Sequence, residues 1–97
     1  MIFNFIAKRR PPSKHTLAGQ PVGAHVLIDS FLASPRATEH LINLGLVPGV
    51  EIEVVRRSPA GDPRIYRIEG GTELALRRDL SAKIVVRPRL RREGTPA

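Results

Sequence analysis

The segment 50–57 constrains the fold of this chain more than any other, because apolar and charged residues alternate through its first five positions. Val50, Ile52 and Val54 fall on one side of an extended chain, and two glutamates fall on the other. Successive side chains of a β-strand point to opposite faces. The pattern therefore predicts a strand with one face in a hydrophobic core and the other in water.

Four further segments are short, rich in apolar residues and bounded by turn residues, and they too are predicted to be strands. Pro and Gly between them discourage regular structure and allow tight reversals, as in Pro59–Pro63 and Gly70-Gly71. The remaining predicted strands are residues 24–29, 64–69, 73–77 and 83–87.

One helix is predicted over residues 35–44. Ser34 suits the N-cap and Pro35 suits the first helical position. Gly45 can adopt the left-handed conformation that closes a helix, and Leu46 can make the accompanying apolar contact. The apolar stripe expected to face the core consists of Ala37, Leu41 and Leu44, widened by Ile42.

Five short strands and one helix after the first strand predict a mainly β domain of about 70 residues, folded as a small antiparallel barrel. A flat sheet covered by the helix is the competing architecture. The chain has 97 residues and a formal net charge of +7, but residues 21–86 hold equal numbers of acidic and basic side chains. The excess charge therefore lies near the ends, and we expect a domain at 16–88 between basic tails at 1–15 and 89–97.

Several kinds of site are disfavoured by what the chain contains. It has no cysteine, which excludes disulfides, thiolate metal sites and cysteine nucleophiles. None of its serines stands in a nucleophile motif, and the glycine pair lacks the Lys-Ser/Thr of a phosphate loop. His15, His25 and His40 do not have the spacing of metal ligands. We expect no enzymatic activity, no cofactor and no metal site.

Four motifs follow one another in a fixed order along the predicted domain. They are Leu44-Gly45-Leu46-Val47-Pro48-Gly49 with the alternating strand after it, Pro59-Ala60-Gly61-Asp62-Pro63, Leu74-Ala75-Leu76-Arg77-Arg78, and Ala82 with Ile84 and Val86. Over about residues 16–87 this series resembles the FeoA family of bacterial ferrous iron uptake. Two features depart from that family: His40 stands where arginine is common, and a basic extension precedes the first strand.

The resemblance implies an SH3-like barrel without enzymatic activity. It also implies a cytoplasmic protein whose partner is a FeoB-like membrane Fe(II) transporter with a GTP-binding domain. Within the chain, the candidate partner-binding loop is Leu46, Val47, Pro48 and Gly49. Exposed apolar groups can mark partner surfaces, although Pro48 and Gly49 also suit a purely structural turn and Leu46 also suits a helix cap.

The tail 1–15 offers a candidate membrane-surface segment. Phe3 and Phe5 precede Lys8, Arg9 and Arg10, and apolar residues followed by basic ones suit weak docking to an anionic inner membrane. The alternative is a solubilising end without structure, which is the commoner meaning of such runs.

Two other functions are compatible with parts of the sequence. The pairs Arg56-Arg57 and Arg77-Arg78 allow a nucleic-acid-binding barrel, but the neutral domain and the scarcity of aromatic residues argue against it. The pairs are better explained as mixed surface charge, and no nucleic acid is expected. Direct binding of a transition metal in a regulatory role is the third possibility.

Overall fold

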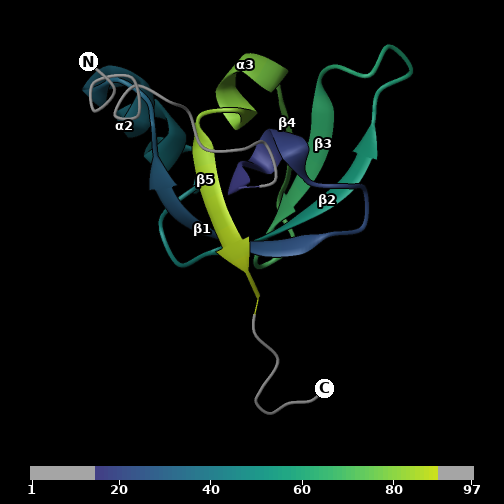
Figure 1. Ribbon diagram of the computed structural model, residues 1–97, viewed down its shortest axis with the longest axis horizontal. Coiled ribbons are helices and arrows are strands. Elements are labelled where there is room, and N and C mark those ends of the chain that lie inside the picture. Colours follow the sequence, from purple (N-terminus) through teal and green to yellow (C-terminus); the bar gives the residue numbers. More distant parts are fainter. Residues whose placement is uncertain (1–14, 90–97) are drawn as a thin grey trace, which may run out of the picture.

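The computed structural model describes residues 15–89, and the candidate membrane-surface residues Phe3, Phe5, Lys8, Arg9 and Arg10 lie outside this range. The described part contains five strands, two α-helices and one short 3₁₀ helix (Figure 1). In chain order they are η2 (Leu17–Gly19), β1 (His25–Phe31), α2 (Pro35–Asn43), β2 (Glu51–Arg57), β3 (Arg64–Ile68), β4 (Glu73–Leu76), α3 (Arg78–Ser81) and β5 (Ile84–Pro88).

The five strands form one antiparallel sheet in the order β4-β3-β2-β1-β5. Its register shifts between Ile28 and Ser30 in β1 and between Val54 and Arg56 in β2. Such bulges bend a strand and increase its twist. The sheet curls around η2, which contacts both β5 and α3 (Figure 1). The predicted mainly β, barrel-like fold with one helix after the first strand is confirmed.

The core lies inside the curled sheet and consists of the side chains that the strand patterns place on one face. Ile52 and Val54 of β2 are fully buried, as the alternation predicts, and Tyr66 of β3 is fully buried beside them. Leu17 of η2 completes the core from the side opposite the sheet. The buried hydrophobic residues are Leu17, Val26, Ile28, Leu41, Leu46, Ile52, Val54, Tyr66, Ile68, Leu76, Ile84 and Val86.

Helix α2 begins and ends as its sequence predicts. The Ser34 hydroxyl oxygen accepts a hydrogen bond from the Ala37 N–H at 3.2 Å. Gly45 has a φ of +99°. The Leu46 N–H donates to the Leu41 carbonyl at 3.1 Å, and the Gly45 N–H donates to the Ile42 carbonyl at 2.9 Å. These two bonds make the Schellman motif of a helix closed by glycine.

The apolar stripe predicted for this helix is only partly correct. Leu41 is fully buried, but Ile42 is 41% exposed and Leu44 is 39% exposed. Helix α2 lies at one end of the barrel instead of across the sheet (Figure 1). Leu44 is also the C-cap residue, where the chain already turns away. One turn of the helix therefore reaches the core, and the flat sheet covered by a helix is wrong.

Replacing Gly45 with alanine should lower the free energy of unfolding by about 1–2 kcal/mol, because a Cβ is disfavoured at positive φ. The added Cβ would lie 3.6 Å from Ile68 Cδ1, an ordinary contact, so the cost is conformational. Gly45→Asn is the matched control, since asparagine tolerates the left-handed region. Denaturant unfolding should rank the proteins wild type, Asn, Ala. Equal stability of the Ala variant would contradict this account.

Candidate partner-binding surface and the polar face of the sheet

The loop between α2 and β2 is a hydrogen-bonded turn fixed to the barrel. The Val50 N–H donates to the Val47 carbonyl at 3.1 Å, with Pro48 second in the turn and Gly49 third. Gly49 has a φ of +92°, which the third position of a type II turn requires. Its N–H donates to the Ile28 carbonyl of β1 at 2.8 Å. Backbone hydrogen bonds therefore close the turn and attach it to β1.

The four residues predicted for partner binding do not share one environment. Leu46 is fully buried in the core, so its side chain is not available to a partner and serves as the apolar contact of the helix cap. Val47 is half-buried, whereas Pro48 and Gly49 are exposed. The accessible part of the loop is therefore Val47–Gly49.

The exposed end of α2 adds apolar side chains beside this loop. Ile42 and Leu44 precede it directly and are about two-fifths exposed. We call Ile42, Leu44, Val47 and Pro48 the α2–β2 corner. The helical periodicity placed both Ile42 and Leu44 in the stripe expected to face the core, and no sequence signal marked them as exposed.

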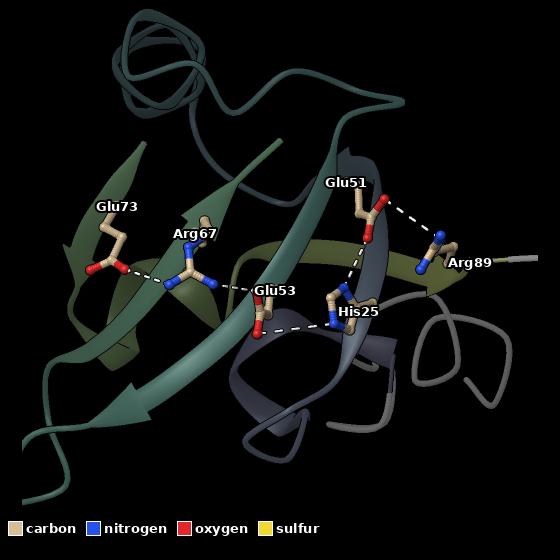
Figure 2. A network of polar contacts seen from close by, with 6 residues as sticks. All are labelled: His25, Glu51, Glu53, Arg67, Glu73 and Arg89. Atoms are coloured by element: carbon tan, nitrogen blue, oxygen red, sulfur yellow. Dashed lines mark hydrogen bonds and ion pairs between the residues drawn. The ribbon is translucent and has the colours of Figure 1, made fainter. Parts of the chain in front are cut away.

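The outer face of the sheet carries a network of ion pairs (Figure 2). Arg67 of β3 lies between two carboxylates: its Nη2 is 2.7 Å from Glu73 Oε2, and its Nη1 is 2.6 Å from Glu53 Oε1. The hydrogen bonds to Glu73 and then to Glu53 raise the pKa of the Arg67 guanidinium above its ordinary value. Arg67 thus remains charged and links three strands through their side chains.

The network continues across β1 through His25, whose exposed position the strand pattern predicts. Its Nδ1 is 2.9 Å from Glu51 Oε2, and its Nε2 is 4.0 Å from Glu53 Oε2 (Figure 2). Arg89 lies 3.6 Å from the other Glu51 oxygen. Exposed pairs of this kind contribute little individually. Within residues 15–89, no group of three His, Cys, Asp or Glu side chains could hold a metal ion.

No helix in the described range is both long and apolar enough to cross a membrane. A family model described as the FeoA domain matches residues 15–88, which is most of the chain. The chain belongs to the FeoA family. The comparison with curated protein sequences gives no significant match.

Solved structures of FeoA proteins share this fold. The FeoA protein from Chlorobium tepidum is 32% identical, covering 84% of this chain and 77% of that one, with a TM-score of 0.70. Iron(II) transport protein A from Clostridium thermocellum is 34% identical, covering 73% of this chain and 43% of that one, with a TM-score of 0.68. The chain spans less than half of that second protein.

A third solved structure is described by the type of its fold. Stenotrophomonas maltophilia FeoA, solved with zinc, is 29% identical, covering 74% of this chain and 88% of that one, with a TM-score of 0.64. It is described as a procaryotic SH3 domain protein and a candidate activating factor for ferrous iron transport. The expectation of an SH3-like FeoA fold is confirmed.

Proposed function

We propose that this FeoA-family chain is a non-enzymatic accessory of bacterial ferrous iron uptake that binds the cytoplasmic GTP-binding part of a FeoB-like transporter. Family membership supports the iron-uptake role, as do the names of its relatives, one called iron(II) transport protein A. A small domain without a nucleophile motif or a cluster of metal-ligating side chains in its described part suits binding better than catalysis.

The α2–β2 corner is the observation that carries this proposal. It presents apolar side chains to solvent on a helix end closed by the Gly45 motif and on a turn bonded to β1. Burying exposed apolar surface favours association. A surface that is already ordered loses little conformational entropy on binding. Partner contact is therefore assigned to Ile42, Leu44, Val47 and Pro48, with Gly49 shaping the turn and Leu46 supporting it from the core.

The basic tails suit the same role. In this proposal the protein works in the cytoplasm, and Phe3, Phe5, Lys8, Arg9 and Arg10 contact the inner membrane weakly. A partner in that membrane would then meet the domain at a higher effective concentration. Deleting residues 1–14 should reduce binding to vesicles with anionic lipids and leave binding to an isolated FeoB cytoplasmic domain unchanged.

Replacing Ile42 with aspartate should weaken binding to the cognate FeoB cytoplasmic domain by at least about tenfold, because a carboxylate would be desolvated in an apolar contact. Titration at physiological salt, with and without guanine nucleotide, measures this change. Ile42 is already 41% exposed, so the melting temperature should stay close to that of wild type.

Ala75→Asp is the matched control, since Ala75 is exposed on the edge strand β4, opposite Ile65 and away from the corner. It introduces the same charge and should leave binding intact. Equal weakening by both variants would show that the interface does not lie at the α2–β2 corner. No association of the wild-type chain at high micromolar concentration would overturn the proposed function.

A further inference from the structure

A cavity of about 350 Å³ opens between η2 and the adjoining ends of β2 and β3, on the opposite side of the sheet from the network of Figure 2. Three arginines line it: Arg57, Arg64 and Arg78. None of its lining residues is acidic. Pro21 and Val22 form part of its remaining wall. The cavity is therefore strongly cationic although the central part of the sequence is electrically balanced.

Strand register explains why these arginines meet. Without a bulge, alternation along β2 would place Arg56 on the inner face with Ile52 and Val54. The shift between Val54 and Arg56 instead pairs Arg56 with Ile65 and Arg57 with Arg64. Arg64 shares the inner face of β3 with buried Tyr66, two residues along. Arg57 and Arg64 therefore sit directly opposite each other at the inner end of the barrel.

Among the described residues, the arginines of the cavity lack the ion pairs that the adjacent arginines Arg56 and Arg77 form. Arg56 lies 3.8 Å from Glu73, and Arg77 lies 3.9 Å from Asp79. Arg57, Arg64 and Arg78 form no ion pair within residues 15–89. Asp62 contacts Arg78 only through the backbone, where its Oδ1 accepts a hydrogen bond from the Arg78 N–H at 2.8 Å.

Arg64 is held in place at the base of the cavity. Its Nη1 donates to the Ala18 carbonyl at 2.9 Å, and its Nη2 donates to the Gln20 carbonyl. Its guanidinium carbon also lies 5.9 Å from the centre of the Tyr66 ring. The remaining Nε is buried and has no hydrogen-bond partner in the described part of the chain. Arg64 thus supplies a cation of fixed position at this site.

We propose that this cavity binds a phosphate group. Like charges placed opposite each other on a sheet are destabilising, and a bound anion removes that repulsion. The guanidinium groups of arginine match the geometry of phosphate oxygens. A phosphate, with a charge close to −2, neutralises more of the positive charge of several guanidiniums than a single carboxylate does.

The adjacent arginine pairs provide a matched experiment on the full chain. Pyrophosphate is titrated at constant ionic strength into wild type, Arg57→Gln/Arg78→Gln and Arg56→Gln/Arg77→Gln, with calorimetry or amide chemical shifts as the readout. The two double variants lose the same charge. We expect the cavity variant to bind at least about tenfold more weakly, and the control to bind as wild type does.

Three results would overturn the proposal: no saturable binding by the wild type, equal weakening in both variants, or tighter binding of a glutamate-rich peptide than of pyrophosphate. A second arm identifies the source of the phosphate. Vesicles containing phosphatidic acid, whose headgroup is a phosphomonoester, point to a lipid headgroup if they bind the control variant more tightly than the cavity variant, since both variants keep the basic tails. Pyrophosphate binding with equal vesicle binding by both variants points to a free phosphate compound. Either outcome supports the site.

Discussion

Replacing Leu46 with alanine should lower the free energy of unfolding by about 2–5 kcal/mol, the range for removing a buried leucine side chain from a core. Leu46 is fully buried, and its N–H closes the Schellman motif at the end of α2. The variant would leave a cavity beneath the α2–β2 corner. Because small domains have only about 5–15 kcal/mol of net stability, chemical denaturation should show a clearly lower midpoint.

Val47→Ala is the control, because Val47 neighbours Leu46 in the same loop but is half-exposed. It should cost less than about 1.5 kcal/mol. In the proposed function its loss should appear in FeoB binding instead. A Leu46→Ala protein with wild-type stability and impaired partner binding would reverse the assignment, making Leu46 a contact residue and not a core residue.

The strands were the most predictable part of the fold because their inner faces are marked by alternation. The predicted segments 50–57 and 64–69 correspond to β2 (Glu51–Arg57) and β3 (Arg64–Ile68). The α2 boundaries were equally accessible, since a cap serine, a proline and a glycine leave a local chemical signature. Such signals depend only on residues that are close in sequence, so they can be interpreted without knowledge of the tertiary structure.

Which arginine of an adjacent pair faces outward and which lines the cavity was not predictable in this way. Arg56-Arg57 looks like uniform surface charge, but the bulge at Val54/Arg56 turns one member outward toward Glu73 and the other into the cavity. A bulge is set by pairing with the partner strand, and alternation within one strand does not record it. The cationic cavity follows from register and not from composition.

The exposure of α2 was missed for a related reason. Helical periodicity shows which side chains share a face but not how far along the helix that face touches the barrel. Only Leu41 reaches the core, so Ile42 and Leu44 remain accessible. In the proposed function, the partner-binding loop predicted at 46–49 is therefore extended by Ile42 and the C-cap residue Leu44, and the side chain of Leu46 is left out of it.

Leu17→Ala should also cost about 2–5 kcal/mol of unfolding free energy, although the residue lies at the very start of the predicted domain. No periodicity marks Leu17, which is followed by only one apolar residue before Gly19. In the structure it is fully buried, Thr16 forms a bridge with Val85, and Arg64 binds the Ala18 and Gln20 carbonyls. Segment η2 thus packs inside the curled sheet and contributes Leu17 to its core.

Val22→Ala provides the comparison, because Val22 is 50% exposed a few residues away and should change stability by no more than about 0.5 kcal/mol. Native-state hydrogen exchange would distinguish global from local effects. If η2 is part of the cooperative core, Leu17→Ala should speed exchange of the most protected amides of β1, β2 and β5 together. Faster exchange confined to residues 16–20 would show that the segment docks on a barrel that is stable without it, and that the folded unit begins at β1.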